Sequence, residues 1–237
     1  MPRTVIFDFD GTLALGEGPL DAYVRCVDEV AGVEGFAAAA ATERARLLTE
    51  PGLYRDAYHA VAVAAAGLGI DEDALQQGYL RSRDLLATDD APVEPAPGLG
   101  DFLGRLAAHA ELVLVTNAPE TRIAEALDAL GAAGAFGRIV CSARKPLGLA
   151  AVIDEALNHG PVLSVGDIDE FDLAPARERG AATALVGAAA AAPPAEVTFA
   201  AERLELLYPA IEAWAADSAP LENVPSGTPR TTGTTRS

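Results

Sequence analysis

The first residues able to do chemistry are Asp8 and Asp10, which end the β-rich run 4–10, closed by Gly11. Residues two apart on a strand point to the same face, and the strand rise places their Cα atoms ~6–7 Å apart. Two carboxylates at this spacing can act on one reacting centre. Gly11 lets the backbone turn sharply, so that N–H groups of the loop can meet an anion. An isolated Asp-x-Asp is equally typical of a solvated acidic turn. Other features of the sequence must therefore decide between a reactive pair of carboxylates and such a turn.

Polar groups also close a second apolar run, where Thr116 and Asn117 follow residues 113–115. Their hydroxyl and amide can hold phosphate oxygens. Lys145 follows the next short run and is the only lysine in the chain. A compact, flexible ammonium suits a phosphoryl group as a point-charge partner. Taken alone, Thr116-Asn117 is also ordinary at the end of a strand, and a lysine is usually a surface residue. A chain that otherwise uses arginine throughout nevertheless favours a functional role for Lys145.

A third apolar run, 163–165, is followed by Gly166 and Asp167, and Asp172 comes five residues after Asp167. Carboxylate oxygens suit Mg²⁺, which takes one or two carboxylates together with water and substrate phosphate. Asp172 is also suited to cap a helix over 173–178, a contribution of about 1 kcal/mol. The two roles are compatible.

Short apolar runs that predict strands recur along the chain, at 112–116, 138–141, 162–165, 183–186 and, more weakly, 197–200. Helical patterns lie at 121–130, 147–158, 172–178 and 202–214. Strands that alternate with helices in this way predict an α/β fold with a doubly wound, Rossmann-like parallel sheet. Such folds bind ligands at the carboxyl ends of the strands, which is where the polar groups described above are expected.

Residues 14–96 interrupt the alternation with four helical segments, at 20–30, 37–48, 54–66 and 72–86, which glycine and proline separate. We predict that residues 14–96 form an inserted α-helical cap domain and that residues 1–13 and 97–216 form the core domain. Residues 217–237 are rich in Thr, Ser, Pro and Gly, which predicts a disordered C-terminal tail.

Composition argues against several classes of partner. The 237 residues include 17 Lys and Arg against 35 Asp and Glu, a net charge of −18. This charge cannot supply the basic surface that nucleic-acid binding needs, and an anionic membrane would repel it. The 2 cysteines lie far apart and make no disulfide framework, and no apolar run reaches the ~18 residues of a spanning helix. We therefore expect a cytoplasmic protein, a monomer or weak homodimer, that acts on a small molecule.

Taken in order, the motifs resemble those of the haloacid-dehalogenase-like (HAD) hydrolase superfamily. They are Asp8-Phe9-Asp10-Gly11-Thr12, then Thr116-Asn117, then Lys145-Pro146, then Gly166-Asp167 with Asp172. The resemblance covers about residues 4–215, including the helical insert. It implies that Asp8 is the nucleophile that becomes an aspartyl-phosphate. It also implies that Asp10 protonates the leaving alcohol and then activates water.

The same resemblance implies a Mg²⁺ cofactor held by the carboxylates of Asp8 and Asp167 and by the backbone carbonyl of Asp10. Asp172 would ligate the ion or orient its ligands, although Asp169 is an alternative that the sequence leaves open. Thr116, Asn117 and Lys145 would neutralise charge on the transferring phosphoryl group. For a lysine in this role, we expect Lys145→Ala to reduce activity far more than stability.

The helical insert resembles a mobile cap that closes over the site and selects the leaving group. Six cap side chains are candidates for substrate contact: Arg46, Arg55, Tyr58, His59, Arg81 and Arg83. Solvated helix faces are the plainer interpretation of each. Arg55 is the best single candidate, since it follows the turn at Pro51 and Gly52.

One residue separates the reaction classes of the superfamily. Its dehalogenases lack a carboxylate at the second acidic position of the first motif, because a halide leaves without a proton. Asp10 therefore favours a phosphatase that acts on a small phosphorylated metabolite. A phosphomutase of the same family, similar to β-phosphoglucomutase, is the main alternative. A non-hydrolytic signalling module that accepts phosphate on aspartate is more remote, because such modules carry the acceptor on their third strand and have no helical insert.

Overall fold

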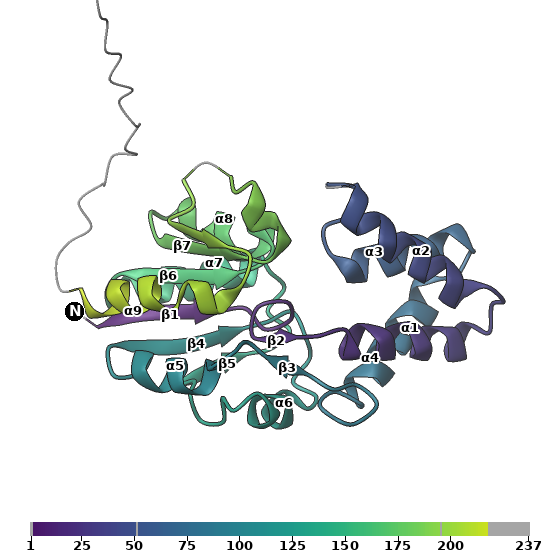
Figure 1. Cartoon of the computed structure of the whole chain (residues 1–237), viewed down its shortest axis with the longest axis horizontal. Helices are drawn as coiled ribbons and strands as arrows, with labels where there is room; N and C mark the ends of the chain where they lie inside the picture. Colours follow the sequence, from purple (N-terminus) through teal and green to yellow (C-terminus); the bar gives the residue numbers. More distant parts are fainter. Residues whose placement is uncertain (1, 51, 195, 218–237) are drawn as a thin grey trace, which may run out of the picture.

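The computed structural model describes residues 2–50, 52–194 and 196–217. Its centre is a parallel sheet of six strands in the order β5-β4-β1-β6-β7-β8 (Figure 1). The strands are β1 (Arg3–Phe7), β4 (Ala110–Val115), β5 (Arg138–Val140), β6 (Val162–Gly166), β7 (Ala182–Val186) and β8 (Phe199–Ala201). The predicted doubly wound α/β class is confirmed. Strand β1 is central, and β4 and β6 flank it.

The apolar strands bury side chains on both faces of the sheet, because alternate residues point to opposite sides. Val5 and Phe7 pack on one side with α5 (Leu99–Leu106), α6 (Ile123–Ala129) and α9 (Tyr208–Ala216). Ile6 packs on the other side with α7 (Leu147–Leu157) and α8 (Ala174–Arg177). Two helical layers therefore hold β1 rigidly, which fixes the position of the loop that follows Phe7.

Four helices between β1 and β4 form a separate cluster beside the sheet, which we call the helical insert (Figure 1). They are α1 (Gly18–Ala31), α2 (Phe36–Thr49), α3 (Ala57–Gly67) and α4 (Glu72–Arg83). Tyr23, Phe36 and Val61 belong to its own apolar core. The chain enters the insert through β2 (Ala14–Leu15) and returns through β3 (Glu94–Pro95), and these two short strands pair antiparallel.

Several predicted boundaries were wrong. Strand β1 ends at Phe7 and not at Asp10, so both aspartates lie in the loop beyond it. The helix expected at 172–178 is a π-helical turn (Asp169–Leu173) followed by the single turn of α8. Helix α5 was not predicted, because its short segment Leu99–Leu106 carries two glycines. The predicted tail, apart from Asp217, lies outside the described residues. Within the described ranges, no helix has the length and apolar character needed to cross a membrane.

Candidate functional site

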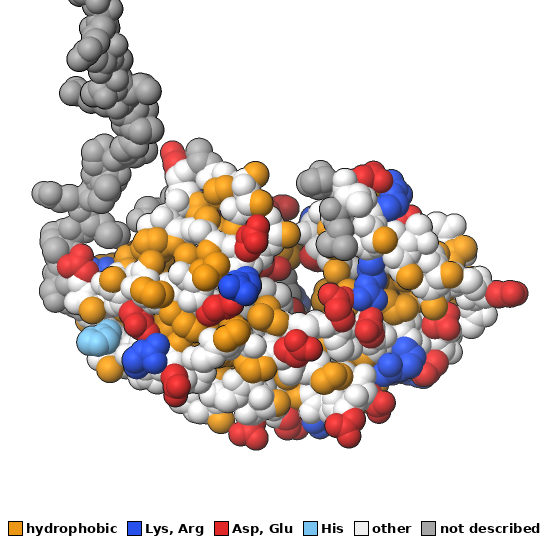
Figure 2. All heavy atoms as spheres, in the orientation of Figure 1, with side chains coloured by type: hydrophobic (Ala, Val, Ile, Leu, Met, Phe, Trp, Pro, Cys, Tyr) orange, Lys and Arg blue, Asp and Glu red, His pale blue; other side chains and the backbone are white. Residues whose placement is uncertain are grey.

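The carboxyl ends of β1, β4 and β6 meet at the sheet edge that faces the helical insert, and a cavity of about 580 Å³ lies there. Figure 2 shows the surface hollowed between the two parts of the molecule. Eight residues of the sequence motifs line this cavity: Asp8, Asp10, Gly11, Thr116, Asn117, Lys145, Asp167 and Asp172. The topology thus brings together side chains that are up to 164 positions apart, from Asp8 to Asp172.

Lys145 lies at the centre of the charged groups. Its Nζ donates hydrogen bonds to Oδ1 of Asp8 and, over 2.7 Å, to Oδ1 of Asp172. All three side chains are buried. The Thr12 hydroxyl donates to Oδ2 of Asp8 over 3.3 Å. Asp8 is therefore held on both carboxylate oxygens, with one oxygen facing the ammonium.

The electrostatics of the site favour an additional cation. Burial, reinforced by the charge of Asp172, raises the pKa of Asp8 to about 7 although Lys145 opposes the shift. Burial and the charge of Asp8 raise the pKa of Asp167 well above its ordinary value. Burial alone would lower the pKa of Lys145, but its two carboxylate partners outweigh that effect and raise it. Asp8, Asp167 and Asp172 exceed the single ammonium by two negative charges when all are ionised, which matches a divalent ion.

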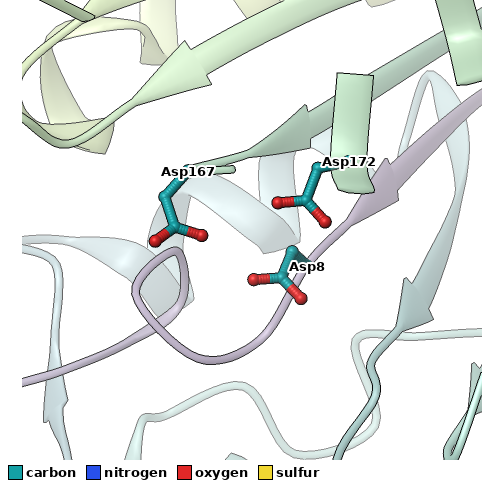
Figure 3. Close-up of side chains that lie close together, drawn as sticks. All are labelled: Asp8, Asp167 and Asp172. Atoms are coloured by element: carbon teal, nitrogen blue, oxygen red, sulfur yellow. The ribbon is translucent and has the colours of Figure 1, made fainter. Parts of the chain in front are cut away.

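Three carboxylates are placed so that they could hold a metal ion. Asp8, Asp167 and Asp172 each offer an oxygen, and these oxygens lie within 4.8 Å of one another. The three side chains converge at the end of β1 (Figure 3). Oδ1 of Asp167 is buried and has no hydrogen-bond partner among the described residues. An oxygen-only set with one unpartnered carboxylate oxygen fits a hard cation such as Mg²⁺.

Gly11 keeps the first loop close to this cluster. Its φ is +82°, and a Cβ atom there would lie 2.4 Å from Oδ2 of Asp167. A side chain at this position would therefore displace the Asp167 carboxylate. The glycine thus allows the loop to approach Asp167 closely, and it also allows the sharp turn expected from the sequence.

The structure also shows which of Asp172 and Asp169 lies beside the other carboxylates, a question that the sequence leaves open. Both Asp169 carboxylate oxygens face the guanidinium of Arg177, with Oδ2 2.8 Å from Nη2. Asp172 faces Lys145 and belongs to the cluster of three carboxylates. Its Oδ2 accepts from the backbone N–H of Ile168 over 3.0 Å. Asp172 lies within the π-helical turn and does not cap α8.

These positions give a matched test of metal binding. We expect a divalent cation at about one hundred times its Kd to stabilise the wild type by about 2.7 kcal/mol. For a chain of this size, that corresponds to a rise in Tm of roughly 5–10 °C. Asp167→Asn should lose most of the rise, whereas Asp169→Asn should keep it. Thermal unfolding with Mg²⁺ and with EDTA measures both, and equal shifts in the two variants would contradict the assigned ligands.

Thr116 and Asn117 also hold the loops that carry the charged residues. The Thr116 hydroxyl oxygen accepts from the Ala118 backbone N–H over 3.0 Å. Oδ1 of Asn117 accepts from the Lys145 backbone N–H over 2.7 Å. Asn117 therefore fixes the loop that presents Lys145, and its amide NH₂ is the group it can offer to a phosphate oxygen.

Arg83, at the end of α4, is the residue that the sequence interpretation underrated. It is 1% exposed, and its Nη1 lies 3.1 Å from Oδ1 of Asp10. Its Nε and Nη2 are buried and have no hydrogen-bond partner within the described part of the chain. An arginine in the last turn of a helix is ordinary in a sequence. Nothing local to Arg83 therefore indicated that it contacts Asp10, 73 positions away.

Arg55, the predicted substrate contact of the helical insert, lies beside the cavity and does not line it. Helix α3 begins at Ala57 with Asp56 as its N-cap, so Arg55 lies in the preceding turn. The Arg55 guanidinium carbon lies 5.3 Å from the ring centroid of Phe171, and Arg55 is not among the residues that line the cavity. Tyr58, another of the six candidates in the helical insert, does line it.

Known proteins resemble the chain in family and in fold. A family model described as haloacid dehalogenase-like hydrolase matches residues 2–180. No curated protein matches the chain significantly in sequence. Among similar solved structures is YfnB from Bacillus subtilis, assigned as a HAD-hydrolase and bound to magnesium. It is 20% identical, with 89% of this chain and 98% of YfnB covered and a TM-score of 0.62.

Two further structures share the fold. A haloacid dehalogenase-like family hydrolase from Xanthomonas campestris is 20% identical, with 90% of this chain and 93% of that protein covered and a TM-score of 0.56. A 2-haloacid dehalogenase from Pseudomonas syringae pv. Tomato DC3000 is 22% identical, with 90% and 99% covered and a TM-score of 0.51. At these identities, the similarity establishes the fold alone.

Proposed function

We propose, on the premise that this chain belongs to the haloacid dehalogenase-like hydrolase family, that it is a magnesium-dependent phosphatase of a small phosphorylated metabolite. The observation that carries the proposal is that the Asp10 side chain lines the same cavity as Asp8. A phosphate ester needs an acid to protonate its leaving alcohol, whereas a halide leaves as a stable anion. A second carboxylate beside the nucleophile is therefore useful for phosphate chemistry and superfluous for dehalogenation.

Asp8 and Asp10 divide the reaction into two displacements at phosphorus. A carboxylate oxygen of Asp8 attacks phosphorus, the bond to the ester oxygen breaks, and Asp10 gives that oxygen its proton. An aspartyl-phosphate on Asp8 and a free alcohol result. Asp10, now a carboxylate, takes a proton from water as the water oxygen attacks phosphorus. The Asp8 carboxylate and inorganic phosphate are released, which restores both residues.

The remaining residues of the site stabilise charge on the phosphoryl oxygens. Lys145 has three N–H donors and uses two of them on Asp8 and Asp172, so the third is available to a phosphoryl oxygen. Asn117 offers its amide NH₂ and Thr116 its hydroxyl hydrogen. Mg²⁺ held by Asp8, Asp167 and Asp172 would supply further positive charge at the same oxygens. The burial of these groups strengthens each interaction, because little water screens them.

The helical insert acts in this proposal as a cap over the site. It supplies one wall of the cavity, and Arg83 connects it to Asp10. Because Asp10 is both acid and base, the cap residue that holds its carboxylate affects both displacements. Arg83 is therefore proposed as a positioning residue, since it touches Asp10 rather than the substrate.

Arg83→Gln tests this role. We expect kcat to fall about ten- to hundredfold, because small displacements of a catalytic group have effects of this size. KM should change by less than about threefold, since Arg83 does not line the cavity. Arg81→Gln, on the same helix and outside the cavity wall, is the control and should leave both constants unchanged. Steady-state kinetics decides, and an unchanged kcat in Arg83→Gln would contradict the role.

The proposed activity has a direct assay. Purified protein with Mg²⁺ should release inorganic phosphate from p-nitrophenyl phosphate, and EDTA should stop the release. The same protein should release no chloride from 2-chloropropionate. Chloride release without phosphate release would assign a dehalogenase. Phosphoryl transfer to a second sugar phosphate without release of inorganic phosphate would assign a mutase.

A further inference from the structure

The wall that the helical insert contributes to the cavity is aromatic and acidic. Tyr23, Tyr58 and Tyr79 line it together with Asp56 and Glu72. Among the described residues that line the cavity, Lys145 is the only cation, and it lies on the sheet side. The cavity therefore has a phosphate-binding end with a cation and an opposite end with none.

The three tyrosines form one cluster. Ring centroids of Tyr23 and Tyr58 are 5.5 Å apart, those of Tyr23 and Tyr79 are 5.8 Å apart, and those of Tyr58 and Tyr79 are 6.3 Å apart. The last two pairs meet edge to face, so the rings present differently oriented surfaces. The face of an aromatic ring carries negative potential and attracts cations within about 6 Å. Burial raises the pKa of Tyr58 well above its ordinary value, which keeps its hydroxyl neutral.

The acids of this wall, Asp56 and Glu72, form no ion pair with the described residues. Asp56 uses Oδ1 to accept from the His59 backbone N–H over 2.7 Å, which leaves its second carboxylate oxygen. Glu72, in the first turn of α4, is exposed and forms no ion pair within the described ranges. Two arginines lie near this wall without lining the cavity. Arg83 pairs with Asp10, and its guanidinium carbon lies 5.9 Å from the ring centroid of Tyr79, while Arg55 lies over the ring of Phe171. Among the described residues that line this end of the cavity, a second anionic group of a substrate would meet carboxylates and no cationic side chain.

We propose that the leaving group of the substrate carries an ammonium, so that the substrate class is the phosphomonoesters of amino alcohols, of which phosphocholine and phosphoethanolamine are the simplest. This inference rests on the proposed phosphatase function and adds the substrate class. The phosphoryl group lies against Lys145, and the ammonium lies among the three tyrosines with Asp56 and Glu72 beside it. The net charge of −18 also favours a substrate with a cationic end, since it would repel one that is only anionic.

The test compares phosphocholine with its carbon analogue, in which a tert-butyl group replaces the trimethylammonium. The two esters have nearly the same shape and differ in one positive charge. We expect kcat/KM for phosphocholine to exceed that of the analogue by about tenfold or more, which is the range of a desolvated cation–π site. Phosphoglycolate, which has a second anion, should be the poorest substrate. Equal rates for phosphocholine and the analogue, or a faster rate for phosphoglycolate, would overturn the inference.

Two pairs of variants locate the preference. Glu72→Gln should reduce the preference for phosphocholine about three- to tenfold through KM, and Asp73→Asn, on the same turn and outside the cavity wall, should leave it unchanged. Tyr58→Leu should reduce the preference while Tyr58→Phe keeps it, because the ring and not the hydroxyl attracts the cation. Thermal unfolding of each variant establishes that it is folded. A preference unchanged in both Glu72→Gln and Tyr58→Leu would overturn the proposed location.

Failure of this inference can be distinguished from failure of the proposed function. Hydrolysis of p-nitrophenyl phosphate without a preference for phosphocholine would overturn only the substrate class. If the protein hydrolyses neither ester, the proposed phosphatase function is wrong. The ammonium site is then tested by the binding of choline alone. Saturation-transfer NMR on the methyl protons of choline, with phosphate present, should show contact in the wild type and a loss of signal in Tyr58→Leu. No contact in the wild type would overturn the ammonium site.

Discussion

Asp8→Asn is expected to abolish phosphate release, with kcat lower by about 10⁴-fold or more, as for the loss of other catalytic nucleophiles. The amide has nearly the shape of the carboxyl group and its oxygen can still accept from Lys145, but it cannot form an acyl-phosphate. Steady-state phosphate release from p-nitrophenyl phosphate with Mg²⁺ measures the loss. Asp169→Asn, whose carboxylate faces Arg177 and not the cavity, is the control and should retain wild-type rates.

The same substitution should stabilise the metal-free protein at alkaline pH. The folded protein raises the pKa of Asp8 to about 7 from its ordinary value of 3.8, so ionised Asp8 is disfavoured on folding. The stability associated with neutral Asp8 is therefore complete below about pH 4 and is lost as pH rises through 7. Asn stays neutral throughout. In EDTA at pH 8 we expect Asp8→Asn to gain on the order of 1–3 kcal/mol, reduced because Lys145 then meets one charge fewer.

Urea unfolding at pH 5 and pH 8 in EDTA measures this effect. The advantage of Asp8→Asn over the wild type should be larger at pH 8 than at pH 5. A variant that is inactive yet more stable would show that the carboxylate serves function at a cost to folding. Asp8→Asn with wild-type turnover would remove Asp8 as the nucleophile, and an advantage that grows toward pH 5 would contradict the electrostatic account.

Lys145→Ala is expected to lose both activity and stability. The sequence predicts a far larger loss of activity than of stability, but the structure places Nζ in ion pairs with two buried carboxylates. Removal of one partner of a buried ion pair costs about 3–5 kcal/mol, because it leaves buried charge uncompensated. Activity should fall at least about a hundredfold as the phosphoryl group loses its cationic partner. Arg138→Ala is the control, since its exposed pair with Glu155 contributes at most about 1 kcal/mol.

The stability loss in Lys145→Ala should shrink in acid, where the carboxylates take up protons, and on addition of Mg²⁺, which supplies replacement charge. Urea unfolding at pH 5 and pH 8, with and without Mg²⁺, tests both effects. Lys145→Arg should not restore activity fully, because a planar guanidinium does not replace a compact ammonium between two carboxylates. Wild-type stability of Lys145→Ala in EDTA at pH 8 would contradict the central place of Lys145 in the charge balance.

The site residues that could be predicted from the sequence are those that lie at the ends of strands. Asp8, Thr116 and Asp167 each follow an apolar run that is buried on both faces, and parallel strands place their carboxyl ends at one edge. The order of strands around β1 then brings the three residues together. Lys145 was selected because its residue type is unique in the chain, although its pairing with both Asp8 and Asp172 depends on loop conformation.

The features that could not be predicted depend on tertiary contacts. Asp169 and Asp172 are both acids in one short segment, and only the π-helical turn determines which of them faces Lys145. Arg83 reaches Asp10 only because α4 packs with its last turn over the first loop. Helix α3 begins at Ala57, three residues later than predicted, and Tyr58 lines the cavity whereas Arg55 does not. Helix boundaries of this kind are set by caps such as Asp56, and they decide which side chains face a cavity.

The central claim is that a phosphoryl group passes through Asp8. Rapid acid quench of the protein during turnover of a phosphate ester with a radiolabelled phosphoryl group, with Mg²⁺ present, tests it most directly. Peptide mapping of the quenched protein should find the label on the segment that contains Asp8, in an acyl-phosphate that hydroxylamine removes. Asp8→Asn should carry no label. Phosphate release without labelled protein, or a label that maps to another residue and persists in Asp8→Asn, would contradict the account.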